Sequence, residues 1–303
     1  MEDYEKYYQN CRLCPRECGA DRLHGESGFC RVTSVLRAAR AALHFWEEPC
    51  ISGRRGSGAV FFSGCNVGCV YCQNHQIADG SSGKDISTDR LTQIFFELKE
   101  KGAENINLVT PDHYAPAIAH ALKKARGQGL DLPVIYNGSA YIYPRTLDLL
   151  KPYVDVWLPD LKYMDADIAG LYSHAADYFP IASRAIDYMV KAAGPAQFDS
   201  RGMIRRGVIV RHLVLPGCRK DAQNVIRYLY ETYGDDIYIS IMGQYTPLPG
   251  QLDNFPQLNR RITSREYDAC LDYALDLGVV NAYIQERGTA KESFIPAFDN
   301  EGV

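Results

Sequence analysis

Three closely spaced cysteines, Cys65, Cys69 and Cys72, form the motif with the clearest chemistry in this chain. They follow a short apolar run at 58–62 that is typical of a buried strand, so we expect them in the loop at that strand's end. Soft thiolate ligands suit iron, and a cube of four irons and four sulfides takes one ligand per iron. Three thiolates would therefore hold three irons and leave the fourth open.

The open iron predicts a small-molecule ligand. Such an iron can chelate the amino and carboxylate groups of S-adenosylmethionine and place its sulfonium beside a one-electron donor. The same spacing also suits a three-cysteine zinc site or unpaired thiols in the core. The preceding strand, the glycines Gly64 and Gly68 and the Tyr71-Cys72 pair favour the cluster over both alternatives.

A second group of cysteines lies near the N-terminus: Cys11, Cys14, Cys18 and Cys30. Such a group can close around one metal, and the glycines before Cys30 permit tight turns. Either a structural zinc ion or a second iron–sulfur cluster would suit these ligands, and free thiols are a third interpretation. The choice has consequences, because a cluster can carry an electron or bind substrate whereas zinc is redox-inert.

Composition and charge are those of an ordinary globular protein. The chain has 303 residues, 46% of them hydrophobic, which suits one large α/β domain with an appendage or two average domains. A net charge of −4 argues against nucleic acid as the main partner. No apolar run reaches about 18 residues and the acidic start is unlike a signal peptide, so we expect no membrane segment and a cytoplasmic location. In a reducing compartment, the two cysteine groups indicate metal binding rather than disulfides.

Beyond the triad, strand patterns alternate with helix patterns along the chain. Strands are expected at 58–62, 106–109, 132–136, 154–158, 207–215 and 237–241. Helices are expected at 89–102, 114–126, 144–150 and 222–233, with a helical pair inserted at 165–193. The stretch 34–45 shows neither pattern and is interpreted as connecting structure. Such alternation builds a parallel sheet covered by helices, and six units predict an α/β fold with an open, partial (β/α)6 barrel like an incomplete TIM barrel.

We divide the chain into three parts on this basis. A cysteine-rich metal-binding segment takes up 1–57, and the partial barrel takes up 58–250. A C-terminal helix, strand and tail at 251–303 are expected to pack on the barrel.

Polar residues follow the second and third predicted strands, where catalytic groups gather in parallel barrels. Thr110 and Asp112 come directly after the second strand and open a helix whose free N–H groups can meet a carboxylate. The alternative is that they only cap that helix. Asn137 ends the third strand in the same way.

The fourth and fifth strands carry charged residues. Lys162 follows the fourth strand and would bring a cation over the barrel mouth, unless it only pairs with Asp160 at the surface. The fifth strand contains Arg211 and His212, and side-chain alternation can face either of them inward. His212 in an apolar strand is better explained as a hydrogen-bonded core histidine than as a catalytic base.

Together these features resemble the radical SAM superfamily. Its signature is three cysteines in C-x3-C-x2-C spacing with an aromatic residue, here Tyr71, before the last. The Asp160-Leu161-Lys162 strand end and the strand at 211–217 narrow the resemblance to pyruvate formate-lyase activating enzyme and its relatives. The N-terminal cysteines and the segment 107–111 are more similar to the uncharacterised relatives than to the activase itself. The resemblance covers about 58–245.

The resemblance implies a [4Fe-4S] cluster held by the triad. It also implies reductive cleavage of S-adenosylmethionine to methionine and a 5'-deoxyadenosyl radical, which abstracts a hydrogen atom from a substrate. The family commonly has a Gly-Gly-Glu-type strand end that holds the amino group of S-adenosylmethionine. This chain has Thr110-Pro111-Asp112 at that place, so Asp112 is the candidate substitute. Tyr71 would lie along the adenine of S-adenosylmethionine, and Asp160 and Lys162 would lie around its methionine part. The full set of expected S-adenosylmethionine ligands is Tyr71, Thr110, Asp112, Asn137, Asp160, Lys162 and Arg211.

Three functions remain open from the sequence. The first is an activase that uses a one-electron donor such as flavodoxin or ferredoxin and installs a glycyl radical on a partner protein. The second is modification of a small molecule or a peptide side chain, which predicts a more closed pocket. The third is a non-catalytic electron carrier or metal-binding module, which predicts a cluster without productive binding of S-adenosylmethionine.

Overall fold

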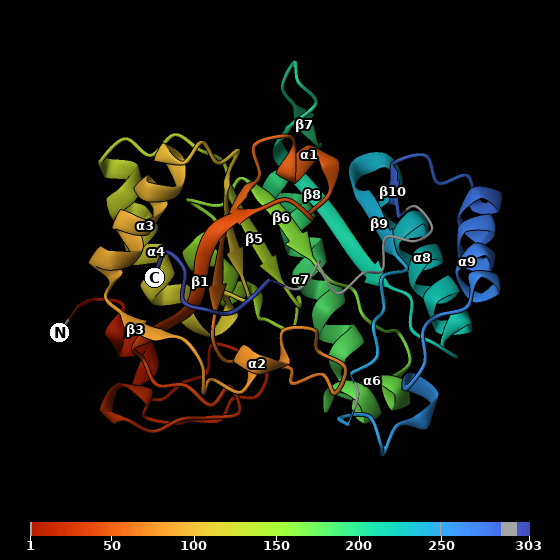
Figure 1. The fold of residues 1–303 in the computed structure, drawn as a ribbon, viewed down its shortest axis with the longest axis horizontal. Helices are drawn as coiled ribbons and strands as arrows, with labels where there is room; N and C mark the ends of the chain where they lie inside the picture. The colour runs from red at the N-terminus through yellow and green to blue at the C-terminus, as the bar shows by residue number, and fades with distance from the viewer. Residues whose placement is uncertain (1, 249, 286–295) are drawn as a thin grey trace.

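One mixed sheet forms the centre of the molecule (Figure 1). The computed structural model describes residues 2–248, 250–285 and 296–303. Along the sheet the strands lie in the order β10-β9-β8-β6-β5-β4-β2-β1-β3, and β7 pairs with β8 beside this path. Their bounds are β1 (Leu36–His44), β2 (Ser57–Phe62), β3 (Lys84–Ile86), β4 (Ile106–Val109), β5 (Val134–Gly138), β6 (Val156–Pro159), β7 (Gln197–Phe198), β8 (Ile204–Leu213), β9 (Tyr238–Met242) and β10 (Ala282–Ile284).

Most of the sheet is parallel. From β2 through β4, β5, β6, β8 and β9 to β10, each strand runs parallel to its neighbour. At the other end, β1 pairs antiparallel with both β2 and β3. Within the described ranges, the end strands β10 and β3 do not pair with each other, so the sheet is open. The predicted α/β fold, with its open and mostly parallel sheet, is therefore confirmed.

Strand β1 corrects the interpretation of 34–45 as connecting structure. It pairs with β2 from Ala38 opposite Phe62 to His44 opposite Ser57. Its sequence is rich in alanine and arginine, which are poor or indifferent strand formers, so no strand pattern was visible. Burial and backbone pairing override this weak propensity, and the C-terminal tail adds a hydrogen bond of 2.8 Å from the Ala41 N–H to the Glu301 carbonyl.

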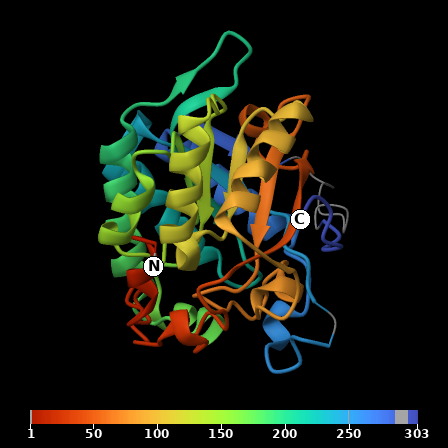
Figure 2. The ribbon, with the colours of Figure 1, turned by 90° about the vertical axis from the view of Figure 1, so that its left-hand side faces the viewer.

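Helices cover the outer face of the sheet. Figure 2 shows α3, α4, α5 and α7 side by side over this face, and α3 contacts α4, α4 contacts α5, and α5 contacts α7. The helix bounds are α1 (Pro49–Ser52), α2 (His75–Ala78), α3 (Thr88–Glu100), α4 (Ala115–Gly127), α5 (Pro144–Leu150), α6 (Ala166–Ser173), α7 (Tyr178–Ala193), α8 (Arg219–Tyr233) and α9 (Ser264–Leu277). The 3-10 helices are η1 (Glu5–Tyr8), η2 (Arg22–His24), η3 (Asp112–Tyr114), η4 (Gly234–Asp236) and η5 (Pro256–Leu258). The predicted inserted pair corresponds to α6 and α7.

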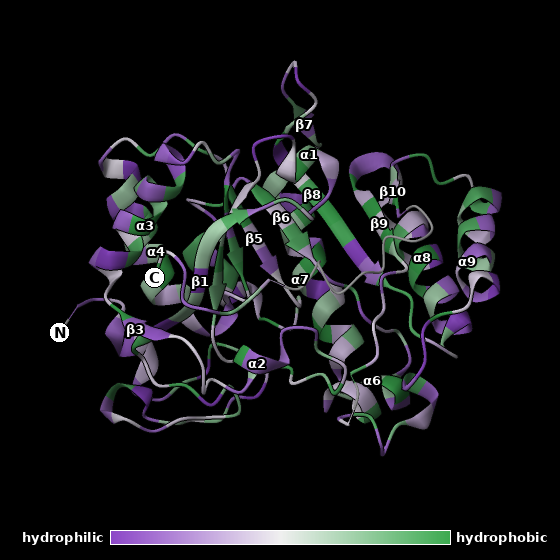
Figure 3. Cartoon of the chain, in the orientation of Figure 1, coloured by the Kyte–Doolittle hydropathy of each residue, from purple (hydrophilic) through white to green (hydrophobic). Residues whose placement is uncertain are grey.

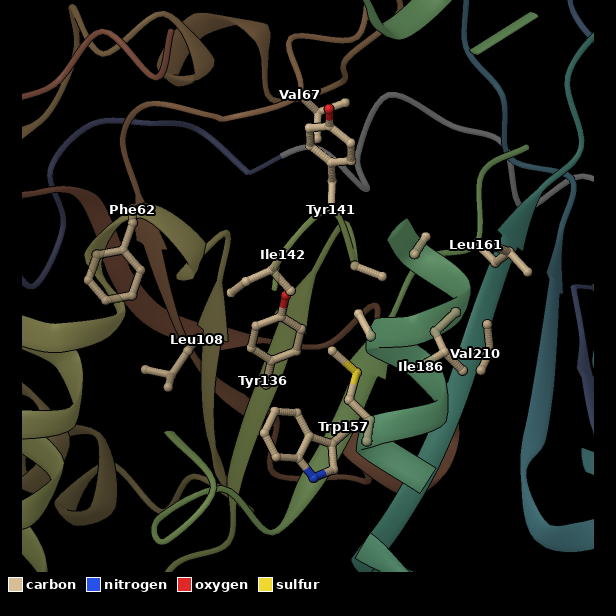
Figure 4. Packing of buried hydrophobic residues seen from close by; sticks show 14 of the residues in the cluster. Phe62, Val67, Leu108, Tyr136, Tyr141, Ile142, Trp157, Leu161, Ile186 and Val210 are labelled. Atoms are coloured by element: carbon tan, nitrogen blue, oxygen red, sulfur yellow. The ribbon is translucent and has the colours of Figure 1, made fainter. Parts of the chain in front are cut away.

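The main core lies between the sheet and these helices. Tyr136 of β5 and Trp157 of β6 point outward with ring centroids 5.4 Å apart, and Ile186 of α7 belongs to the same cluster (Figure 4). Figure 3 shows the largely hydrophobic sheet strands beside helices, such as α3, that carry many hydrophilic residues. Strand alternation therefore turns the residues next to Tyr136 and Trp157 toward the inner face.

A smaller apolar cluster fills the inner face below the strand ends. It contains Ile135, Val156 and Ile209 of three parallel strands, together with Cys50 and Ile51 of α1. The loop that follows β1 therefore plugs this end of the open barrel. Cys50 is a small buried residue here, which is a common role for a free cysteine.

The chain ends pack on this frame. Before β1, the described residues form only the short helices η1 and η2, and η1 contacts both η2 and α4. At the other end α9 packs on α8, and residues 299–301 bond to β1. Part of the predicted C-terminal unit, 286–295, lies outside the described residues. Among the helices of the described ranges, none has the length and apolar character needed to cross a membrane.

Candidate active site

A cavity of about 240 Å³ opens at the carboxyl ends of the parallel strands. Its walls come from the loop after β2 and from the ends of β4, β5, β6, β8 and β9. The predicted residues that line it are Cys65, Cys69, Cys72, Tyr71, Thr110, Asn137, Asp160, Lys162 and Arg211. The structure therefore brings together the triad and the strand-end residues that the sequence selected, with the exception of Asp112.

The triad sits in the loop directly after β2. The backbone N–H of Val67 points at Cys65 Sγ at 3.4 Å, and the Ser173 hydroxyl donates a hydrogen bond to Cys69 Sγ at 3.0 Å. Burial and the neighbouring thiols raise the pKa of Cys65 to about 11 and that of Cys72 to about 12. Without metal these groups are thus protonated at neutral pH, and metal loading must release their protons.

These contacts fit an iron–sulfur cluster. A cube takes one thiolate per iron, so the three thiolates of this loop suit three of its irons. Hydrogen bonds to the sulfur atoms are a usual feature of such sites.

Thr110 lies at the end of β4 in a strained conformation. Its φ of 58° is in the left-handed region, which residues other than glycine rarely adopt. Its backbone N–H donates to the Asn137 carbonyl at 2.8 Å, which ties the ends of β4 and β5 together. Strain of this kind accumulates at functional sites, in agreement with the position of Thr110 on the cavity wall.

Three charged residues form one network on the opposite wall. Lys162 Nζ donates to Asp160 Oδ2 at 2.7 Å, and Arg211 Nε donates to Asp160 Oδ1 at 3.2 Å. Burial disfavours the charge on Asp160, but the two cations outweigh this effect and hold its pKa below the usual value. Burial likewise opposes the charge on Lys162, yet Asp160 and Cys69 raise its pKa well above normal. All three side chains are therefore ionised at neutral pH.

Glu47 completes this network and was missed by the sequence analysis. Its Oε2 accepts from Arg211 Nη1 at 3.0 Å, and its Oε1 accepts from Asn107 Nδ2 at 2.9 Å and Asn137 Nδ2 at 3.2 Å. It lies in the loop between β1 and α1, and its side chain is only 9% exposed. The signal that could have revealed it is the acidic pair Glu47-Glu48 after β1, but that strand was not recognised.

Asp112 is the predicted ligand that does not reach the cavity wall. The turn η3 carries it behind β5, where it is fully buried and its Oδ1 accepts a hydrogen bond from the Tyr136 hydroxyl. Burial raises the pKa of Asp112 to about 6. Gly138 leaves room for this pair, because a Cβ there would stand 2.6 Å from the Tyr136 hydroxyl oxygen.

A chain of hydroxyl groups connects Tyr71 to the triad. The hydroxyl oxygens of Tyr71 and Tyr163 are 2.5 Å apart, and Tyr163 is 2.8 Å from Ser173 Oγ, which in turn donates to Cys69 Sγ. The Tyr71 ring packs against Tyr245 with centroids 6.1 Å apart and lines the cavity. Tyr71 is thus held in place from both its hydroxyl and its ring.

His212 and Arg211 face opposite sides of β8. His212 is buried, with Nδ1 2.8 Å from the Leu161 carbonyl, and burial lowers its pKa to about 4. It is therefore a neutral core histidine, and alternation along β8 turns Arg211 into the cavity.

The comparison with protein families agrees with this geometry. The model of the Radical SAM superfamily matches residues 59–217, more than half of the chain. The chain belongs to the radical SAM superfamily. Membership indicates an enzyme with a [4Fe-4S] cluster and S-adenosylmethionine as cofactors, so the predicted family and cofactors are confirmed.

Proteins of similar sequence or structure support the fold of this chain but do not identify its substrate. Uncharacterized protein MJ0674 of Methanocaldococcus jannaschii is 29% identical over 287 residues, which cover 91% of this chain and 79% of that protein. SuiB of Streptococcus suis, bound to its precursor peptide SuiA, has 12% identity and a TM-score of 0.50 over 73% of this chain and 46% of SuiB. A domain of pyruvate-formate lyase-activating enzyme from Bacteroides vulgatus has 15% identity and a TM-score of 0.39 over 57% of this chain and 92% of that domain. The chain thus spans about half the length of SuiB.

Proposed function

We propose that this radical SAM enzyme cleaves S-adenosylmethionine reductively and abstracts a hydrogen atom from a partner protein, as a glycyl radical activase does. The observation that carries the proposal is that the triad, Tyr71 and the charged strand-end network line one cavity. A cluster held by Cys65, Cys69 and Cys72 would supply the single electron for reductive cleavage of S-adenosylmethionine to methionine and the 5'-deoxyadenosyl radical. The protein supplies binding, orientation and exclusion of water.

The strand-end residues suit the methionine part of S-adenosylmethionine. Lys162 provides an ammonium group for its carboxylate, and Asp160 provides a carboxylate for its amino group. Arg211 keeps Asp160 ionised and in place through the bond of 3.2 Å. Tyr71 offers a fixed aromatic face for the adenine.

The open side of the barrel favours a peptide as the substrate. Trp46 lines the cavity and is 52% exposed. A large aromatic residue that is exposed at a cavity rim is a typical contact for a peptide segment. A small molecule as the substrate is the alternative, and it predicts turnover without any partner protein.

A one-electron donor and a reducing compartment complete the proposal. Flavodoxin or ferredoxin suits the donor role, because the triad requires one electron in each reaction. All ten cysteines lie in the described residues and none is in a disulfide, which agrees with a cytoplasmic location.

The proposal is tested by electron paramagnetic resonance. The anaerobically reconstituted enzyme, S-adenosylmethionine, a reductant and candidate glycyl radical proteins are incubated together, and the spectrum is recorded. A glycyl doublet on the partner, absent with Cys72→Ala, is the expected result. A stable mass change on a small molecule with no partner radical would contradict the activase role and support the alternative.

A further inference from the structure

The N-terminal cysteines lie together in a segment with little secondary structure of its own. Cys11 and Cys30 are buried, Cys14 is half-buried and Cys18 is exposed. Cys18 Sγ lies 3.9 Å from the Cys11 carbonyl oxygen, and Cys30 Sγ lies 4.0 Å from the Val32 carbonyl oxygen, which Arg22 also contacts. Cys14 interacts electrostatically with both Cys11 and Cys30. The four thiols therefore belong to one cluster of side chains, which is separate from the active-site cavity.

The backbone turns so as to make room for these sulfur atoms. The Cys11 N–H donates to the Ala20 carbonyl at 3.1 Å, and the Gly19 N–H donates back to the Cys11 carbonyl at 3.1 Å. At Gly28, a Cβ would stand only 2.3 Å from Cys18 Sγ, so any larger residue would displace that sulfur. These turns therefore position the thiol groups and are not part of a regular helix or strand.

A buried cation faces this group. Arg22 is 1% exposed and donates to the carbonyls of Val32, Thr33 and His113 at 3.1, 2.8 and 2.7 Å, and its Nη1 is 3.6 Å from Cys11 Sγ. No carboxylate in the described ranges forms an ion pair with it. A buried guanidinium without a counter-charge is costly. Thiolates bound to a metal centre keep a net negative charge and would supply that counter-charge, whereas neutral thiols would not.

We propose that Cys11, Cys14, Cys18 and Cys30 bind a second iron–sulfur cluster. Four thiolates can hold either zinc or a cluster, and both centres would supply the negative charge that faces Arg22. A cluster is preferred because this segment packs on the loop that carries the triad, where a redox-active centre can exchange an electron with the active cluster and zinc cannot.

The segment packs directly on the loop that carries the triad. At Gly64, next to Cys65, a Cβ would stand 2.7 Å from the Cys30 carbonyl oxygen. Arg16 donates from Nε to the Asn66 carbonyl at 2.9 Å, and its guanidinium lies 3.8 Å from the centre of the Phe29 ring. These contacts fix the two cysteine groups as neighbours. The exposed Cys18 marks the solvent side of the second group, and Cys30 marks the side toward the triad.

This arrangement suits the transfer of one electron to the active cluster. A reduced donor protein of the flavodoxin or ferredoxin class would give one electron to the second cluster at its solvent side, and that cluster would pass the electron to the oxidised triad cluster. The donor is oxidised by one electron, the triad cluster is reduced by one electron, and no bond forms or breaks. This role rests on the proposed function, whereas the metal site itself does not.

Metal analysis tests the site independently of any activity. The full chain is reconstituted anaerobically with iron and sulfide, and iron, sulfide and zinc are measured per chain. The wild type should hold about twice the iron of the double variant Cys11→Ala/Cys14→Ala and of the triple variant Cys65→Ala/Cys69→Ala/Cys72→Ala. The triple variant should still show the Mössbauer signature of a cluster. The variant Cys270→Ala, which removes a buried thiol outside both groups, should keep the full iron content.

Two results would overturn the second cluster. One is a triple variant that contains no iron although its circular dichroism is that of the wild type. The other is one zinc per chain, bound by the triple variant and lost from the double variant. Electron transfer is then tested by mixing with a reduced flavodoxin: the double variant's remaining cluster should be reduced more slowly than in the wild type, while dithionite reduces both equally. Equal rates with flavodoxin would overturn the relay and leave the metal site intact.

Discussion

Glu47 and Arg211 form an ion pair of 3.0 Å across the barrel although they are 164 positions apart in the chain. Glu47 comes from the loop after the antiparallel strand β1, and Arg211 from the parallel strand β8. The pair therefore connects the plug at the inner face to the charged wall of the cavity. Since Arg211 also holds Asp160, Glu47 acts as a positioning residue for the proposed S-adenosylmethionine site.

Replacing Glu47 tests this positioning role. Glu47→Gln removes one of the two carboxylates that pair with Arg211, and we expect the free energy of unfolding to fall by about 2 kcal/mol, because a buried ion pair is replaced by a weaker contact. The affinity for S-adenosylmethionine should fall as well. Urea unfolding and equilibrium dialysis measure the two effects. The exposed Glu100→Gln is the control, and an equal effect of both variants would argue against a special role for Glu47.

Lys162 is expected to bind the carboxylate of S-adenosylmethionine. Lys162→Met should raise the dissociation constant by about tenfold, which corresponds to about 1.4 kcal/mol, without loss of iron from the triad. The exposed Lys123→Met is the matched control. An unchanged affinity of the iron-loaded Lys162 variant would remove this residue from the ligand set.

Ser173 is expected to tune the cluster through its hydrogen bond to Cys69 Sγ. Donors to cluster sulfur stabilise the more negative, reduced state, so Ser173→Ala should lower the reduction potential of the triad cluster. A hydrogen bond of about 1 kcal/mol corresponds to about 40 mV for one electron. A redox titration followed by electron paramagnetic resonance gives the potential. Tyr163→Phe, one hydroxyl further away, should produce a smaller shift in the same direction; a positive shift in either variant would contradict this explanation.

Asp112 is expected to affect stability rather than ligand binding. Its folded-state pKa of about 6 exceeds the usual 3.8, so its contribution to stability is full below pH 3.8 and is lost as the pH rises through about 6. Asp112→Asn removes this titration and should be more stable than the wild type by up to about 3 kcal/mol at pH 8, with little difference at pH 4. Urea unfolding at the two pH values measures this change. A pH-independent difference in stability would contradict the raised pKa of Asp112. Tenfold weaker binding of S-adenosylmethionine would show that Asp112 belongs to the binding site although it does not line the cavity.

The parts of the site that depend on local sequence were predictable. Cys65, Cys69 and Cys72 are fixed by spacing within one loop, and Asp160 and Arg211 by their place at the ends of apolar strands. The carboxyl ends of parallel strands meet at one edge of the sheet. Identifying the strands in the sequence was therefore enough to predict that these residues lie close together. The six parallel strands themselves were visible as apolar runs.

The parts that depend on tertiary contacts were not predictable. Glu47 reaches the site only because β1 forms, and β1 is held by its neighbours and by the C-terminal tail rather than by its own alanine-rich sequence. Asp112 follows β4 as the pattern suggested, but the turn η3 and the hydroxyl of Tyr136 carry it behind β5. Neither the turn nor the distant tyrosine leaves a signal in the residues around Asp112.

The measurement that tests the central claim is the release of 5'-deoxyadenosine from S-adenosylmethionine by the anaerobically reconstituted chain with a strong reductant. Cys72→Ala, which removes one ligand of the triad, is the control. We predict release by the wild type and none by the variant. Equal release by both, or none by a wild type whose triad holds an intact cluster and whose partner proteins are supplied, would contradict the claim that this cavity is a radical SAM active site.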